Sequence, residues 1–478
     1  KIIVPNDSDF TPANRKRLLS SIATGDYDAI IITHDQLKMI ENPAELQSEM
    51  IEAEIDDVMN AIIELENMKD VDANKTKRDL IKKQEALEKR YEALKDSKKD
   101  LDVLSFDKLG IDGLIIDESH KFKKLAYSSS LGQIKGMPDQ KGSKMAFDLY
   151  VKVQHILNTT NSKNIVFMTG TPITNTVPEL YLIQKYLQND LLKQQGISNF
   201  DSYAKDYISQ STEVEITATG GFKEVTRIKE FKNMPMLIQS TQQIIDTVTN
   251  EDIKKSSKNF KLPALKDGKP TLVFLEPTKA QLEYNDVLVE RVTNMKKDSP
   301  DNHLVIFNDA AKMSIDMRLV SDSYADENES KINAVVDRAF NKYKEFDNVK
   351  GTQLIFSDLG TPKSDKDKTN LVKLMNRAED GDIDAIKELE NYNDAEIEDI
   401  LSGGNFSVYD DIKKKLIKKG VPSNEVVFIH DYNTKEKKIE LNKEVRTGKI
   451  RFVIGSTQKL GTGINVQERL VAVHHIDI

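Results

Sequence analysis

The stretch Gly113-Leu-Ile-Ile-Asp117-Glu118-Ser119-His120 decides the fold class of this 478-residue chain. An apolar run that ends in two carboxylates is typical of a buried strand with its polar end at the edge of a sheet, where open α/β sheets bind ligands. An Asp at this position can hold Mg²⁺ between nucleotide phosphates, and the next carboxylate can orient an attacking water. Such pairs are common after apolar runs, so this stretch alone leaves an ordinary strand end open. We predict a nucleotide site at Asp117 and Glu118, with His120 hydrogen-bonded across it.

Two further segments place hydroxyl groups and glycines after an apolar run. Residues 164–172 read Asn-Ile-Val-Phe-Met-Thr-Gly-Thr-Pro, and residues 451–465 read Arg-Phe-Val-Ile-Gly-Ser-Thr-Gln-Lys-Leu-Gly-Thr-Gly-Ile-Asn. Threonine hydroxyls can hydrogen-bond toward the carboxylates, and backbone N–H groups near glycines suit phosphates of nucleic acid or nucleotide. The predicted contributions to the site are Thr169, Gly170 and Thr171 from the first segment, and Gly461, Gly463 and Asn465 from the second.

Short apolar runs recur along the chain, each followed by a turn and a stretch with helical periodicity. Continuous apolar runs suit parallel strands that are covered on both faces. Their alternation with helices predicts an α/β fold of doubly wound lobes. The predicted strands are 29–33, 113–117, 164–168, 271–275, 353–356, 426–429, 451–454 and 471–476.

Two segments interrupt this rhythm, and a third lies between the lobes. Residues 45–99 are charged and poor in Gly and Pro, with apolar residues at heptad-like spacing, which predicts an antiparallel helical hairpin inserted into the first lobe. This hairpin is either a solvated spacer or an arm that binds a protein partner or guides DNA. Residues 364–405 predict an acidic helical insertion, either a solvated surface or a regulatory element. Lys-rich residues 251–269 predict the linker between lobes at 1–250 and 270–478.

The composition excludes several classes of protein. A net charge of −9 and a pI of about 5.5 do not indicate a bulk electrostatic grip on nucleic acid, so any contact would need a local basic groove. The absence of cysteine excludes disulfides and thiolate metal sites and favours a cytoplasmic, reducing environment. No apolar run approaches the roughly 20 residues of a membrane span.

In their order along the chain, the three strand ends resemble motifs II, III and V of superfamily 2 helicases. The run Asp-Glu-Ser-His, followed by Thr-Gly-Thr-Pro-Ile-Thr-Asn at 169–175, is similar to the Swi/Snf-type branch with its DEAD/DEAH-like box. Residues 30–37 are similar to motif Ib and residues 353–357 to motif IV. The hairpin between motifs Ib and II resembles the helicase region of large phage, plasmid and conjugative-element proteins, often joined to an adenine-N6 DNA methyltransferase. The resemblance covers nearly the whole chain apart from the two insertions.

This resemblance implies two RecA-like lobes and a motor that uses ATP and Mg²⁺ to translocate on double-stranded DNA, usually without separating its strands. It implies a role in DNA modification, restriction or anti-restriction in a mobile element, with a methyltransferase module in the same parent chain. A strand-separating RNA or DNA helicase and a non-catalytic, partner-binding scaffold are the alternatives. The residues expected to contact the nucleic-acid backbone are Thr33, His34, Ser357, Ser456, Thr457, Gln458 and Lys459.

Two parts of the family pattern do not occur within these 478 residues. The sequence contains no Gly-x-x-x-x-Gly-Lys-Ser/Thr phosphate loop, which the resemblance would place before Lys1. The arginine-bearing motif VI would begin just after Ile478. We therefore expect a longer parent protein to hydrolyse ATP and this fragment alone to hydrolyse little or none.

Overall fold

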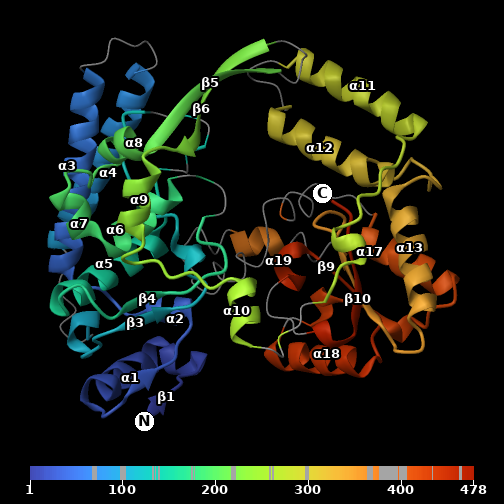
Figure 1. The fold of residues 1–478 in the computed structure, drawn as a ribbon, viewed down its shortest axis with the longest axis horizontal. Coiled ribbons are helices and arrows are strands. Elements are labelled where there is room, and N and C mark those ends of the chain that lie inside the picture. Colours follow the sequence, from blue (N-terminus) through green and yellow to red (C-terminus); the bar gives the residue numbers. More distant parts are fainter. Residues whose placement is uncertain are drawn as a thin grey trace. The chain divides into compact units, whose positions relative to one another are not determined.

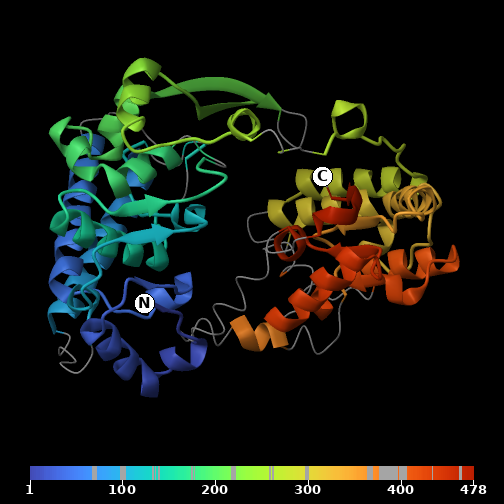
Figure 2. The same ribbon diagram turned by 60° about the horizontal axis from the view of Figure 1, so that its bottom comes forward.

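The computed structural model shows an α/β chain with small, mostly parallel sheets (Figure 1 and Figure 2). It divides into two compact units, Lys1–Ile216 with Phe222–Leu262, and Pro263–Ile478. Each unit has hydrophobic clusters of its own. The structure describes residues 1–66, 73–96, 104–131, 134, 136–137, 140–173, 176, 178–216, 222–257, 260, 263–295, 301–362, 370–375, 397, 406–432, 434–461 and 466–477.

The described residues of the first unit form three two-stranded sheets. The parallel pairs are β1 (Ile2–Ile3) with β2 (Ala29–Ile30), and β3 (Leu114–Ile116) with β4 (Ile165–Phe167). Strands β2, β3 and β4 lie within the predicted strands 29–33, 113–117 and 164–168 but are shorter. The third sheet is an antiparallel ribbon of β5 (Ile208–Ile216) and β6 (Phe222–Phe231) that the sequence analysis did not predict.

Helix α5 (Lys144–Thr159) forms the centre of the first unit. Its apolar residues recur at helical spacing, so that Ala146, Leu149, Val153 and Ile156 all lie in the main cluster. The other described helices of this unit are η1 (Asp7–Phe10), α1 (Pro12–Thr24), α2 (His34–Lys38), α3 (Ala44–Glu66), α4 (Ala73–Asp96), η2 (Phe106–Lys108), η3 (Ser119–Phe122), α6 (Glu179–Leu187), α7 (Asn189–Gln194), α8 (Phe200–Tyr207), α9 (Met234–Thr241) and α10 (Asn250–Ser256).

Helices α3 and α4, which lie within the predicted hairpin region 45–99 except for Ala44, run antiparallel and side by side (Figure 1). Lys77 Nζ lies 2.6 Å from Glu66 Oε1 at one end, and the Tyr91 hydroxyl donates to Glu52 at the other. Their apolar faces share a cluster with Phe147 and Val151 of α5. Both helices are therefore packed onto the unit by buried side chains.

The second unit is built on a four-stranded parallel sheet in the order β10-β7-β9-β8. The strands are β7 (Thr352–Phe356), β8 (Val426–Phe428), β9 (Phe452–Gly455) and β10 (Leu470–His475). Ile355 packs in one cluster with α13 (Lys331–Glu345) and α17 (Val408–Lys418), whereas Leu354 and Phe356 pack in another with α18 (Lys435–Thr447). Both faces are covered, which explains why these strands are continuous apolar runs.

Further helical segments complete the described part of the second unit. They are η4 (Lys266–Gly268), α11 (Lys279–Thr293), α12 (His303–Ile315), η5 (Met317–Leu319), η6 (Ser423–Glu425), η7 (Ile429–Asp431), α19 (Thr457–Leu460) and η8 (Gln467–Arg469). Of the predicted acidic insertion 364–405, only residues 370–375 and 397 are described, so that prediction lies mostly outside the described residues.

The predicted strand 271–275 is wrong. These residues have no regular secondary structure, and Leu272 and Phe274 are 69% and 89% exposed. An apolar run becomes a strand only where it finds a ladder partner, and Pro270 and Pro277 flank this run closely and each lack the N–H that a ladder needs.

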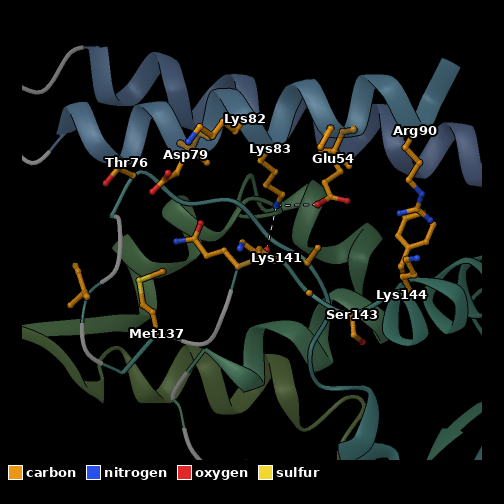
Figure 3. Close-up of a pocket in the computed structure, with 18 of the residues that line it drawn as sticks. Glu54, Thr76, Asp79, Lys82, Lys83, Arg90, Met137, Lys141, Ser143 and Lys144 are labelled. Atoms are coloured by element: carbon orange, nitrogen blue, oxygen red, sulfur yellow. Dashed lines mark hydrogen bonds and ion pairs between the residues drawn. The ribbon is translucent and has the colours of Figure 1, made fainter. Parts of the chain in front are cut away.

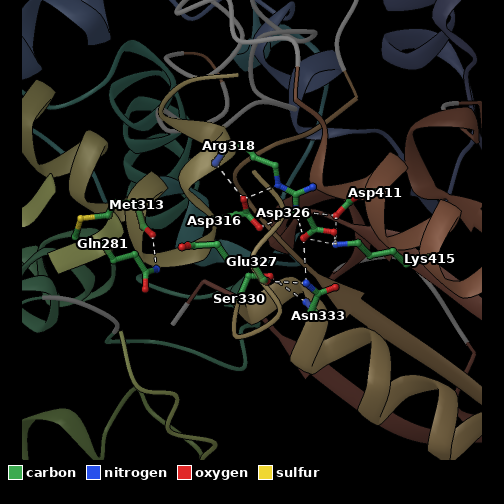
Figure 4. Close-up of polar contacts among 10 residues, drawn as sticks. All are labelled: Gln281, Met313, Asp316, Arg318, Asp326, Glu327, Ser330, Asn333, Asp411 and Lys415. Atoms are coloured by element: carbon green, nitrogen blue, oxygen red, sulfur yellow. Dashed lines mark hydrogen bonds and ion pairs between the residues drawn. The ribbon is translucent and has the colours of Figure 1, made fainter. Parts of the chain in front are cut away.

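Two arginines stabilise the second unit through ion pairs and hydrogen bonds. Arg318, within η5, bonds to Asp316 at 2.8 Å and to Asp326 and Asp411 at 3.0 Å (Figure 4). Arg451, just before β9, is fully buried. Its Nε donates to the Gly351 carbonyl at 2.6 Å, and one terminal nitrogen lies 2.9 Å from Asp347 Oδ1.

Candidate nucleotide site at the β3–β4 edge

The carboxyl ends of β3 and β4 lie side by side because the two strands are parallel and in register, with Ile116 opposite Phe167. Two hydrogen bonds continue the pairing beyond the strands. Met168 N donates to the Ile116 carbonyl at 2.8 Å, and Ser119 N donates to the Met168 carbonyl at 3.0 Å. The residues that follow each strand are therefore brought to one edge of the sheet, where α/β proteins bind ligands.

The two carboxylates at this edge are exposed. Asp117 Oδ1 accepts a hydrogen bond from the Glu118 backbone N–H at 2.9 Å. Glu118 has φ 49° and ψ 43°, in the left-handed region that residues with a side chain rarely adopt. Strained backbone of this kind clusters at functional sites.

His120 connects the end of β3 to the end of β4. Its Nδ1 lies 3.3 Å from Glu118 Oε2 and 3.1 Å from Thr169 Oγ1. Thr169 Oγ1 in turn accepts from the Thr171 backbone N–H at 3.1 Å. The structure thus brings together five of the predicted residues, Asp117, Glu118, His120, Thr169 and Thr171. The sixth, Gly170, is exposed, and a Cβ added there would meet no atom within 4 Å.

His34 also belongs to this edge, although the family resemblance implied a nucleic-acid contact for it. Its Nε2 lies 2.8 Å from the Asp117 carbonyl oxygen, and its ring meets the Phe122 ring edge-on with centroids 4.9 Å apart. A carbonyl oxygen only accepts, so Nε2 carries the hydrogen. Burial lowers the pKa of His34, which favours the neutral ring. Thr33 caps α2, because its Oγ1 accepts from the Gln36 N–H at 3.2 Å.

Loss of the His34 ring should loosen the segment that carries the carboxylates. We expect His34→Ala to speed hydrogen exchange of the amides at 117–122 by roughly fivefold, because one hydrogen bond contributes about 1 kcal/mol net. His34→Gln keeps a donor N–H and should exchange more slowly than His34→Ala. The readout is hydrogen–deuterium exchange of peptides that cover 117–122. His303→Ala, on an exposed position of α12, serves as the control, and equal exchange in all variants would refute the role of His34.

The predicted contacts of the second unit are partly buried. Ser357 and Ser456 are 0% exposed. Ser357 Oγ donates to the Leu359 carbonyl at 2.9 Å, and Ser456 Oγ accepts from the Lys459 N–H at 3.4 Å. Their hydroxyl groups therefore bond within the unit. Thr457 and Gln458 are exposed.

An aspartate pair lies at the edge of the second unit's sheet where Ser357 and Ser456 also lie. The sequence analysis did not predict this pair. Asp358 Oδ1 accepts from the Thr457 N–H at 2.6 Å, and Asp477 accepts from the Asp358 N–H. Burial raises the pKa of Asp477. Gly461 is exposed and its N–H donates to the Thr457 carbonyl, whereas Gly463 and Asn465 lie outside the described residues.

Asp117 and Glu118 have the donor chemistry that Mg²⁺ requires. Mg²⁺ binds through one or two carboxylates and completes its shell with water and phosphate oxygens. Both carboxylates are exposed, and Asp117 has no ion-pair partner among the described residues. Within the described part of the chain, no group of three or more His, Asp or Glu side chains forms a complete metal site. Nor is any described helix long and apolar enough to cross a membrane.

Two comparisons with known proteins place the chain. A family model described as "Probable helicase domain" matches residues 1–249. The chain is also 23% identical, over 152 residues, to "Defense against restriction protein B" of Escherichia phage P1. That match covers 31% of this chain and only 7% of the phage protein. The predicted resemblance to helicases is thereby confirmed at the general level. Because the family model covers more than half of its residues, the chain belongs to the probable helicase domain family.

Proposed function

We propose that this chain is part of an ATP-dependent motor of the Swi/Snf type that translocates on double-stranded DNA, with its two units acting as RecA-like lobes. One observation carries the proposal: adjacent parallel strands bring Asp117, Glu118, His120 and Thr169 to a single sheet edge. Phosphoryl-transfer motors need carboxylates for metal and water at such an edge, with a neighbouring group that responds to the nucleotide.

Each residue of the edge has a distinct task in this proposal. Asp117 would hold the Mg²⁺ of bound ATP, which neutralises charge on the phosphates. Glu118 would orient and deprotonate the attacking water. His120 would report occupancy to β4 through Thr169. His34 would hold the Asp117 backbone in place.

The biological setting follows from the name of the phage relative and from the resemblance to mobile-element proteins. We propose that the parent protein serves restriction, anti-restriction or DNA modification in the cytoplasm, with a methyltransferase module in the same chain. Exposed Thr33, Thr457 and Gln458, together with half-buried Lys459, are the remaining candidates for contacts with DNA phosphates. Such contacts would make binding salt-dependent with little base specificity.

A strand-separating helicase is the second candidate, because the family description names a helicase. The test measures three activities of the parent protein: ATP hydrolysis with and without duplex DNA, displacement of the third strand of a triplex, and separation of a forked duplex. A translocase hydrolyses ATP faster with duplex DNA and displaces the third strand without separating the fork. Fork separation would favour the helicase, and no DNA-stimulated hydrolysis would refute both.

A further inference from the structure

A cavity of about 1070 Å³ lies between α4 and the segment that leads into α5 (Figure 3). Residues of α4 line it at helical spacing, among them Thr76, Lys83 and Arg90, so one face of the helix forms one wall. Ser143 and Phe147 also line it. The volume lies just above the range of about 300–1,000 Å³ that is common for ligand pockets.

The cavity is basic although the chain as a whole carries a net charge of −9. Glu54 and Lys83 pair with each other at 3.0 Å, so their charges offset locally. The remaining charged side chains are mostly cationic. The full set of charged lining residues is Lys82, Lys83, Arg90, Lys141, Lys144, Glu54 and Asp79. A local basic surface on an acidic protein selects for anionic ligands.

Arg90 is the best-placed cation of this set. Its guanidinium carbon lies over the Phe147 ring, 4.1 Å from the ring centre, which is a cation–π contact. Among the described residues Arg90 has no hydrogen-bond or ion-pair partner. A guanidinium carries five N–H donors in a planar fork. That arrangement suits bidentate contact with phosphate oxygens.

Lys83 has a different task, because its ammonium group is used within the protein. It donates to the Tyr127 carbonyl at 2.8 Å and to Ser128 Oγ at 3.1 Å. These bonds hold α4 against the segment that follows the Asp117–His120 edge. Ser143 Oγ accepts from the Ala146 N–H at 3.1 Å, which leaves its own hydroxyl hydrogen for a ligand.

We propose that this cavity is a nucleic-acid site of the first unit that binds phosphates of the sugar–phosphate backbone through Arg90. Lys82 and Lys144 add charge, and half-buried Met137 offers apolar surface to sugars or bases. The proposed function enters this inference at one point, where nucleic acid is chosen among the ligands that carry phosphate. It gives α3 and α4 the role of a DNA-guiding arm.

The test measures binding of a short fluorescein-labelled DNA duplex, and of its single strand, to the 478-residue chain by fluorescence anisotropy. Arg90→Ala should raise the Kd for DNA by roughly tenfold. The slope of log Kd against log salt concentration should fall by about one, because one phosphate contact is lost. Arg78→Ala is the matched control, because Arg78 lies on the same helix, bonds to the Asn74 carbonyl and does not line the cavity. Its binding should equal that of the wild type.

A second variant guards against a folding defect in Arg90→Ala. Lys82 and Lys144 are exposed, and Lys144 is the first residue of α5, where an acidic side chain is favourable. The double variant Lys82→Glu/Lys144→Glu should therefore fold and bind DNA more weakly than Arg90→Ala.

Three outcomes would overturn the proposal. In the first, both cavity variants bind DNA as tightly as the wild type. In the second, Arg90→Ala and Arg78→Ala lose equal affinity for DNA. In the third, Arg90→Ala weakens only the binding of ATP or inorganic phosphate, each added as a competing probe. The last would assign the cavity to small phosphate compounds. Failure of the proposed motor function would be seen separately, as absent DNA-stimulated hydrolysis by a parent whose DNA binding still depends on Arg90.

Discussion

Glu118→Gln is expected to lower DNA-stimulated ATP hydrolysis by the parent protein by about 10²–10⁴-fold. Glutamine keeps the size of the side chain but cannot take a proton from the attacking water. It also removes the negative charge that lies 3.3 Å from His120 Nδ1. Asp117 is untouched, so the variant should still bind ATP. The measurement is steady-state hydrolysis at saturating duplex DNA, paired with ATP binding at equilibrium.

The control for this prediction is the same chemical change at a remote position. Glu230 lies on the exposed side of β6, and Glu230→Gln should hydrolyse ATP at the wild-type rate. A wild-type rate in Glu118→Gln would remove the proposed role of Glu118. A loss of ATP binding in the same variant would instead assign Glu118 to holding the nucleotide.

Arg451→Met should destabilise the second unit by about 3 kcal/mol, because removing a buried donor leaves its acceptors without partners. The Gly351 carbonyl loses a bond of 2.6 Å, and the Tyr343 carbonyl loses one of 3.2 Å. The guanidinium also packs 4.4 Å from the centre of the Tyr343 ring. Methionine replaces the stem of the side chain but none of these bonds. Hydrogen exchange of peptides from β7 and β9 measures the loss where it arises.

Lys350→Met provides a matched comparison, because Lys350 and Arg451 bond to the same atom, Asp347 Oδ1, each at 2.9 Å. The Lys350 pair is about half exposed, with side-chain exposures of 52% and 54%. An exposed pair contributes at most about 1 kcal/mol. Equal effects of the two substitutions would show that the shared ion pair, and not the buried carbonyl bonds, stabilises this region.

Much of the strand framework could be predicted from the sequence, because buried parallel strands are continuous apolar runs. The run at 353–356 is one such case, and β7 is covered on both faces. The same criterion failed at 271–275, where Phe274 lies in solvent, since hydrophobicity alone does not supply a ladder partner. It also missed the ribbon of β5 and β6, because much of that ribbon is exposed and its strands mix polar with apolar residues.

The candidate site was predictable where a contact joins residues that directly follow strands. Asp117 and Thr169 fall into this group, since each follows an apolar run. The contact of His34 with Asp117 could not be predicted, because a side-chain bond to a main-chain oxygen 83 residues away leaves no pattern of residue types. The burial of Ser357 and Ser456 could not be predicted either, because the sequence does not show whether a small hydroxyl residue after a strand points inward or outward.

The left-handed backbone of Glu118 sets stability against activity in this part of the protein. A residue with a side chain costs about 1–2 kcal/mol in that conformation, and glycine does not. Selection for heat resistance alone would therefore favour Glu118→Gly, which relieves the strain and removes the carboxylate. In a library of variants ranked by thermal stability, the most stable members should thus carry glycine at position 118 and be inactive. Activity must be selected together with stability to keep the glutamate.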